Sequence, residues 1–228
     1  MISAISLYFV VTIGALLPIV NPLSAAPIFL SVTAGYSAKR RNRQAQLAAI
    51  YMAAILLVSL FAGALVLNFF GITTPILRIA GGLVITRIGF GMLEPTTEQR
   101  ILPAEQKEAE DMDEVAFTPL AMPMLAGPGS IATTIAMATD TAGFAHYTGV
   151  VLGICAVSAA SWITLRSASY LHGVIGKTGM NVVTRLMGLI LICVGIRFIT
   201  VGVIEGLTGE LMIGVLREWI DAIESAGG

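Results

Sequence analysis

The stretch VNPLSAAPIF, residues 20–29, lies inside a segment in which residues 1–38 carry no charge. It places an asparagine and two prolines where a membrane-spanning helix would otherwise run unbroken. Proline lacks an N–H and clashes with the preceding turn, so it kinks or ends a helix. A second stretch, PLAMPMLAGPGS at 119–130, has the same character. Non-helical backbone at membrane depth is tolerated only where it is buried in protein or lines a water-filled cavity. The places where these two stretches interrupt their helices therefore decide the fold.

The composition predicts a membrane protein. Of the 228 residues, 56 % are hydrophobic and 12 % are charged, and the mean hydropathy is +0.88. Soluble domains carry about 25 % charged residues. The net charge of −1 lacks the basic excess that nucleic-acid binding requires. We therefore expect a lipid bilayer, and no nucleic acid, as the surroundings of this chain.

Few residues are suited to metal binding or catalysis. Cys155 and Cys193 lie in apolar runs, which predicts small buried side chains rather than a disulfide framework. The two histidines, His146 and His172, are not spaced for a metal site, and the chain has no HExxH or GxSxG motif. We expect no metal, no cofactor and no enzymatic activity.

Six runs are long and apolar enough to cross a bilayer, which takes roughly 20 helical residues. The six predicted spans are Ile5–Thr33, Gln46–Leu67, Ile76–Leu93, Phe117–Thr139, Tyr147–Leu165 and Leu186–Ile204. The first and the fourth contain the proline clusters, and the sequence therefore predicts an all-α membrane protein with six transmembrane helices.

The distribution of Lys and Arg predicts the orientation. The connection after the first span holds Lys39, Arg40, Arg41 and Arg43, whereas the connections at 69–75 and 140–146 hold no Lys or Arg. Basic residues return in the connections at 94–115 and near 166–185. Because cytoplasmic loops carry the excess of Lys and Arg, we expect both termini on the periplasmic side.

The remaining segments divide the chain into four parts. Residues 1–93 form the first three-span repeat, 94–115 an acidic cytoplasmic linker, and 116–204 the second three-span repeat. Residues 205–228 form a tail in which apolar side chains recur at helical spacing over 210–224. That pattern predicts an amphipathic helix lying in the membrane interface.

The two halves resemble each other. Pro18, Pro22 and Pro27 are separated by four and five residues, and so are the three prolines at 119, 123 and 128, 101 positions later. RIAGGL at 78–83 also aligns with RLMGLI at 185–190, with an offset of 107. Three spans per copy is an odd number, so the second copy enters from the opposite side. This predicts two inverted three-helix repeats with broken first helices, an arrangement in which transporters place their substrate between the broken helices.

The broken segments offer the residues for a solute site. A helix restarting at Ser130, with Ser130 as its N-cap, would present free N–H groups to a carboxylate, and the first break supplies mixed donors and acceptors. Together these groups suit a small zwitterion. Two simpler interpretations remain open, namely that Asn21 only caps a helix and that both clusters are kinks. The candidate substrate-binding residues are Asn21, Pro22, Ser24, Pro27, Gly127, Pro128, Gly129, Ser130, Thr133 and Thr134.

Charged side chains within the spans are few. No Asp or Glu lies in the middle of a span, which disfavours a proton relay of carboxylates and leaves open a coupling ion, Na⁺ or H⁺, or uncoupled efflux. Arg87 and Arg197 lie close enough to span ends to snorkel to the interface, although contact with substrate stays open. We interpret Arg78 and Arg185 as matched anchors at helix ends.

At these residues the chain resembles the MarC family of bacterial inner-membrane proteins. The resemblance rests on NPLSAAPIFLSVT in the first span, RIAGG in the third and PLAMPMLAGPGSIATT in the fourth, and it extends over nearly the whole chain. It implies a six-span protein that transports small neutral amino acids such as alanine and glycine, the activity described for related archaeal members. Arg197 departs from the family pattern, which has a neutral polar residue there.

Other functions remain as alternatives. The Asn21–Pro22 pair is similar to the plan of aquaporin channels, but Met122–Pro123 stands where that plan has a second Asn–Pro. A non-transporting membrane partner protein is a third interpretation. The sequence also leaves open a homo-oligomer, the direction of transport and the identity of the substrate.

Overall fold

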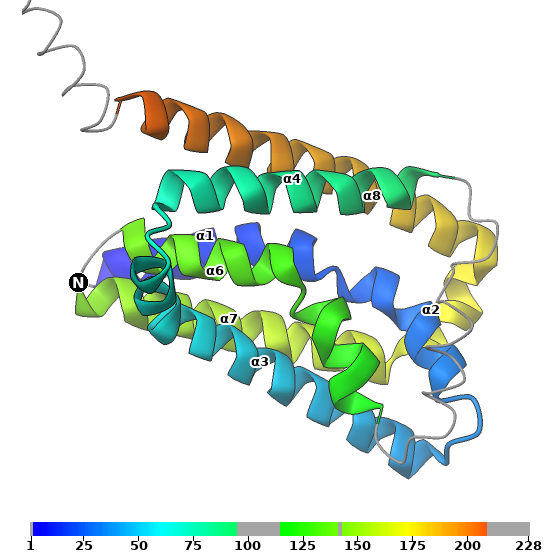
Figure 1. The fold of residues 1–228 in the computed structure, drawn as a ribbon. Helices are drawn as coiled ribbons and strands as arrows, with labels where there is room; N and C mark the ends of the chain where they lie inside the picture. Colours follow the sequence, from blue (N-terminus) through cyan, green and yellow to red (C-terminus); the bar gives the residue numbers. More distant parts are fainter. Residues whose placement is uncertain (1, 95–114, 141–142, 209–228) are drawn as a thin grey trace, which may run out of the picture.

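The computed structural model describes residues 2–94, 115–140 and 143–208, and every regular element in these ranges is a helix (Figure 1). The elements are α1 (Ile2–Val20), α2 (Pro22–Val32), α3 (Ala38–Phe69), α4 (Thr74–Leu93), the π-helix η1 (Ala116–Leu125), α6 (Pro128–Asp140), α7 (Phe144–Arg166) and α8 (Ala168–Thr208). The predicted all-α class is confirmed. The predicted tail helix at 210–224 and all but the two end residues of the acidic linker lie outside the described residues.

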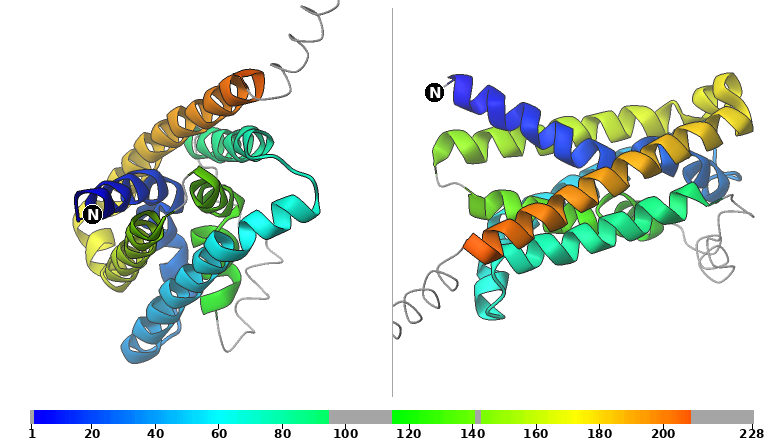
Figure 2. Two further views of the ribbon diagram at one scale, coloured as in Figure 1. Left: turned by 90° about the vertical axis from the view of Figure 1, so that its left-hand side faces the viewer. Right: turned by 90° about the horizontal axis from the view of Figure 1, so that it is seen from above.

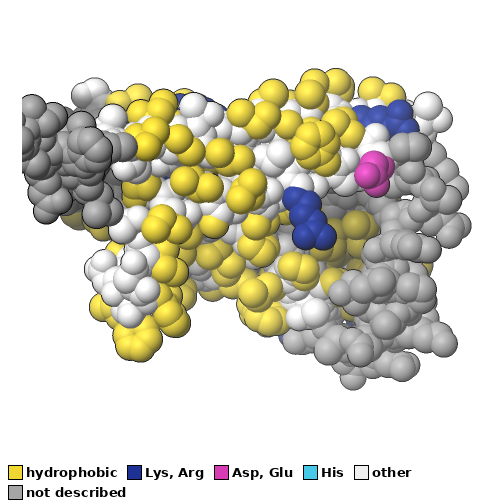
Figure 3. All heavy atoms as spheres, turned by 45° about the horizontal axis from the view of Figure 1, so that its top comes forward, with side chains coloured by type: hydrophobic (Ala, Val, Ile, Leu, Met, Phe, Trp, Pro, Cys, Tyr) yellow, Lys and Arg dark blue, Asp and Glu magenta, His cyan; other side chains and the backbone are white. Residues whose placement is uncertain are grey.

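The helices include the membrane spans that the sequence predicts. Five of them, α1, α3, α4, α7 and the 178–208 part of α8, are long and apolar enough to cross a bilayer, and the number is six when the pair η1 and α6, bent by 63°, is counted as one broken span. The face that carries α4 and α8 is covered mainly by hydrophobic side chains, interrupted by isolated basic ones (Figure 3). The start of α1 and the end of α8 lie at the same end of the molecule (Figure 1), as an even number of crossings requires.

The connection between the last two spans differs from the prediction. The sequence suggested a loop near 166–185, but α7 and α8 are separated only by Ser167, whose N–H donates to the carbonyl of Ile163 at 3.0 Å. The irregularity lies instead at Gly176, which has a φ of 67° inside α8. Glycine accepts this conformation without steric cost, so the chain bends there while the flanking residues stay helical.

α6 lies at the centre of the bundle. It packs against α1, α3 and α4, while α1 also packs along α7 and α4 along α8 (Figure 2). Small side chains allow this close packing, since Ala132, Ala136 and Ala138 of α6 are all buried. The second broken segment therefore leads directly into the interior of the protein.

α4 and α8 are joined along a row of four glycines, which we call the glycine seam: Gly82 and Gly89 of α4 with Gly188 and Gly195 of α8. A Cβ on Gly82 would lie 2.6 Å from the carbonyl oxygen of Gly195, and one on Gly89 would lie 2.7 Å from that of Gly188. The reciprocal distances, from Gly195 and Gly188, are 2.7 and 2.8 Å. Only glycine fits at these four positions, and such small residues let helices approach closely inside a membrane.

Several side chains face outward. Cys155 and Cys193 are exposed, so the prediction that they are buried is wrong; the apolar runs that contain them form the outer surfaces of α7 and α8. Arg87 and Arg197 are exposed as well, a placement that is compatible with snorkelling.

Candidate functional site at the two helix breaks

The first break is built around Asn21. α1 ends at Val20, Asn21 adopts a left-handed conformation with a φ of 42° and a ψ of 64°, and α2 begins at Pro22. Asparagine is one of the few residues other than glycine that visit this conformation readily. Pro22 at the first helical position needs no N–H partner. The Asn–Pro pair therefore both ends α1 and starts α2, and the predicted break is present.

The polar side chains at this break keep unused hydrogen-bonding capacity. Asn21 is buried, and its amide Nδ2 faces the sulfur of Met92 at 3.9 Å while its Oδ1 accepts from the N–H of Ser24 at 3.4 Å. Both contacts are weak, because sulfur is a poor acceptor and 3.4 Å is long for this bond. The Ser24 hydroxyl is buried and has no partner among the described residues. A buried polar group in this condition calls for an explanation, and a bound solute supplies one.

The second break is more irregular than the first. η1 contains Pro119 and Pro123, each preceded by a cis peptide bond, and Thr118 and Met122 have extended backbone angles inside it. η1 ends at Leu125, and α6 starts at Pro128. A Cβ on Gly127 would lie 2.6 Å from the carbonyl oxygen of Pro123. Glycine is therefore required where the chain turns from η1 into α6.

The start of α6 differs from the prediction in one respect. The sequence suggested that the helix restarts at Ser130 with its hydroxyl as the N-cap, but α6 begins two residues earlier, because the fixed φ of Pro128 suits a first helical position. The Ser130 hydroxyl instead donates to the carbonyl of Gly127 at 2.9 Å and lies 3.3 Å from that of Leu125. The N-cap assignment of Ser130 is wrong.

The hydroxyl protons of α6 are used within the break and the helix. Thr133 donates to the carbonyl of Gly129 and Thr134 to that of Ser130, each at 2.8 Å. Both threonines and Ser130 are buried to 1 % exposure or less. Their donors are therefore occupied, in contrast to the unpartnered hydroxyl of Ser24.

The two breaks meet inside the protein. A Cβ on Gly129 would lie 2.7 Å from Cγ1 of Ile85 and 3.4 Å from Cγ2 of Ile19. Ile19 is two residues from Asn21, and Ile85 lies near the middle of α4. The structure thus brings the second break against the end of α1. Pro22 is buried with Asn21, Pro27 is half-buried, and Pro128 is exposed.

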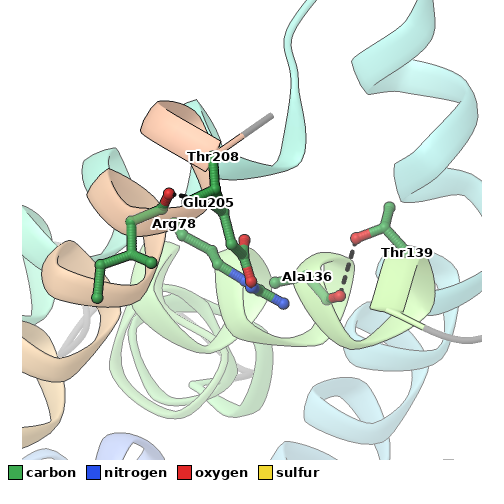
Figure 4. A network of polar contacts seen from close by, with 6 residues as sticks. Arg78, Ala136, Thr139, Glu205 and Thr208 are labelled. Carbon is green, nitrogen blue, oxygen red and sulfur yellow. Dashed lines mark hydrogen bonds and ion pairs between the residues drawn. The ribbon is translucent and has the colours of Figure 1, made fainter. Parts of the chain in front are cut away.

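An ion pair with one buried partner lies near the other end of α6. Arg78 lies in the first turns of α4, near a helix end as expected, but it is only 8 % exposed and pairs with Glu205 of α8. A buried guanidinium needs such a counter-charge. Arg185, its predicted counterpart, is exposed. Figure 4 shows Arg78 and Glu205 pointing toward each other, with Ala136 and Thr139 beside them. The predicted sixth span ended at Ile204, one residue before Glu205, and that boundary hid the pair.

Known proteins match this chain over most of its length. The model of the MarC family of integral membrane proteins matches residues 5–207. The inner membrane protein MarC of Citrobacter koseri and that of Salmonella typhimurium are each 40 % identical to the chain over 201 residues, which are 83 % of this chain and 91 % of each relative. The protein of the same name from Escherichia coli O1:K1 is 38 % identical over the same lengths.

No solved structure matches the chain. The names of the relatives give a location, the inner membrane, and no enzymatic activity. Together with the apolar helices, the family match identifies this chain as a multi-pass inner-membrane protein that belongs to the MarC family.

Proposed function

We propose that the protein is a secondary transporter of small neutral amino acids, of the alanine and glycine type, with its solute site at the two helix breaks. One observation carries the proposal: at the first break a buried asparagine amide with only weak partners and a buried serine hydroxyl with none lie close to where the second break packs. Unused polar groups of this kind are expected where a polar ligand binds.

The charges of the described helices favour a solute without net charge. Acidic residues in the described ranges occur only at helix ends, at Glu94, Asp140 and Glu205, and the groups at the breaks are amides, hydroxyls and backbone atoms. A cationic solute would find no counter-charge among them. A zwitterion of small size could satisfy its amino and carboxylate groups with the neutral donors and acceptors that the breaks supply.

The glycine seam supports the predicted inverted relation of the two halves. A two-fold axis that exchanges residues 106 positions apart maps Gly82 onto Gly188 and Gly89 onto Gly195, so it converts the contact of Gly82 with Gly195 into that of Gly188 with Gly89. Both contacts are present. This offset is one less than the 107 of the sequence alignment. Inverted repeats with interrupted first helices are the arrangement that secondary transporters use around a central site.

The orientation belongs to the same proposal. The basic residues Lys39, Arg40 and Arg43 at the start of α3 and Arg166 at the end of α7 lie at the end of the bundle opposite the start of α1. The positive-inside rule assigns that end to the cytoplasm. Both described ends of the chain then face the periplasm.

Transport is tested with the full chain in liposomes. We expect saturable counterflow of radiolabelled alanine that unlabelled glycine competes with, and a lower rate for the Asn21→Gly variant. Gly14→Ala is the matched control, because a Cβ on Gly14 has nothing within 4 Å. Imposing sodium and proton gradients separately shows whether an ion is coupled. Folded protein without saturable flux of any neutral amino acid would overturn the proposal, and rapid, unsaturable passage of glycerol would indicate a channel instead.

A further inference from the structure

A half-open cavity of about 500 Å³ lies away from the two breaks, where α3 ends, α4 begins and α6 ends, and Asn68, Thr73 and Thr139 on its wall are exposed. Thr139, on its wall, is ten residues beyond Gly129 in α6, which places the cavity about 15 Å along that helix from the second break. None of the ten candidate site residues lines it. Its volume falls within the range of small-molecule sites.

The polar part of the lining is neutral and comes from three different elements. Asn68 belongs to α3, Thr73 and Thr74 to the start of α4, and Thr139 to the end of α6. Thr73 makes no capping hydrogen bond with its side chain, and Thr139 donates to the carbonyl of Ala136 at 2.9 Å, which leaves its oxygen free to accept. Among the side chains that the structure describes, the lining offers an amide and three hydroxyls and no charged group.

The wall formed by α4 is held firmly in place. A Cβ on Gly202 of α8 would lie 2.8 Å from the carbonyl oxygen of Pro75, a lining residue, and 3.1 Å from Cβ of Arg78. One turn farther along, Arg78 pairs with Glu205. Figure 4 shows this pair beside Ala136 and Thr139 of α6. The start of α4 therefore needs little ordering when a ligand binds.

We propose that this cavity is a second binding site for small neutral amino acids, at the end of the bundle where the described chain starts and ends. The ligand class rests on the proposed function. The site would hold the solute where it enters or leaves the path to the breaks. Neutral hydrogen-bonding groups on three sides, with Leu67 and Ile72 beside them, suit a short solute with polar ends and a small apolar side chain.

The test is protection of a cysteine by the solute. In a background of Cys155→Ala and Cys193→Ala, Thr73→Cys is labelled with a membrane-impermeant maleimide with and without saturating alanine. We expect alanine to slow the labelling several-fold. Phe70→Cys is the matched control, because Phe70 lies in the same connection, is 67 % exposed and does not line the cavity. Equal labelling of Thr73→Cys with and without alanine would overturn the proposal.

Two further measurements separate this site from the breaks. Adding Asn21→Gly should weaken transport and leave unchanged the alanine concentration that gives half-maximal protection. If this concentration shifts together with the transport rate, the protection belongs to the breaks and a second site is rejected. The double variant Asn68→Leu and Thr73→Val should raise the KM for alanine and leave the maximal rate nearly unchanged. Absence of transport by the wild type, with protection intact, would reject the proposed function and keep the site.

Discussion

The two helix breaks have the same proline spacing but different structures. At the first, a single left-handed residue, Asn21, separates two helices, and nearby polar side chains remain weakly paired or unpaired. At the second, ten residues of π-helix precede a bend of 63°, and the hydroxyls of Ser130, Thr133 and Thr134 all donate to carbonyls of their own segment. The same proline spacing thus gives two different breaks. At the second, the hydroxyls are hydrogen-bonded within their own segment, whereas at the first, polar side chains lack full hydrogen-bond partners. We infer that the first break provides most of the polar contacts to a solute and that the second break sets the shape of the solute site.

The largest effect should come from filling the contact between the breaks. Gly129→Val places new atoms against Ile85 and Ile19, where a Cβ would already lie 2.7 Å from the former. We expect a loss of about 1–3 kcal/mol in the free energy of unfolding, measured by titration with SDS in mixed micelles. Gly14→Ala, in open space on α1, should keep or raise stability. A Gly129→Val protein as stable as the wild type would show that the breaks do not touch.

The next effect distinguishes the backbone role of Asn21 from its side-chain role. Asn21→Ala forces alanine into a left-handed conformation and should cost about 1–2 kcal/mol of stability. Asn21→Gly keeps that conformation and removes only the side-chain cap of α2, which should lower the stability by only a few tenths of a kcal/mol. Both variants should reduce alanine flux in liposomes. Full flux in Asn21→Gly would mean that the amide only caps α2.

A matched pair of serines tests the difference between the breaks directly. Ser24→Ala removes a hydroxyl without a partner among the described residues, so stability should hold or rise while the KM for alanine increases. Ser130→Ala removes a satisfied hydroxyl and should lower stability by about 1 kcal/mol with little change in KM. Thermal unfolding and initial rates of uptake give both readouts. The opposite result for the two serines would reverse the assignment.

The smallest effect is expected at Thr133 and Thr134. Each hydroxyl bonds only to a carbonyl one turn back in its own helix, a contact that contributes little to helix stability. Thr133→Val and Thr134→Val should therefore change both the melting temperature and the transport rate only slightly. A strong loss of transport in either variant would show that these side chains turn toward the solute.

Sequence reasoning located the breaks because proline acts locally. The missing N–H of Pro22 and Pro128 suits a first helical position, and both helices start there, whereas Pro18 and Pro27 lie inside α1 and α2. The number of membrane segments followed from apolar length alone. These features depend on a few neighbouring residues, so a single sequence suffices to predict them.

The partners of the polar side chains depend on the tertiary structure and were not predictable. Ser130 was assigned as a cap and bonds backward instead. Arg78 was assigned as an anchor at a helix end, and its pairing with Glu205, 127 residues away in the sequence, was not predicted. The periplasmic placement of the termini and the role of the ten site residues remain predictions.

At the end of the bundle with the basic residues, Arg41 of α3 donates to the carbonyl of Thr33 at 3.2 Å and to the hydroxyl of Ser169 at 3.2 Å. One guanidinium thus ties the segment that follows α2 to the first turns of α3 and α8. At the opposite end, beside the cavity, the ion pair of Arg78 and Glu205 links α4 to α8.

The glycine seam restricts how this protein can move. With carbonyl oxygens lying against bare Cα atoms at four points, neither α4 nor α8 can twist about its axis without driving a side chain into the backbone of the other. Any cycle of opening and closing would therefore move α4 and the part of α8 beyond Gly176 together as one rigid unit. The hinges would lie at the ends of this unit, at Gly176 itself or in the six other described elements.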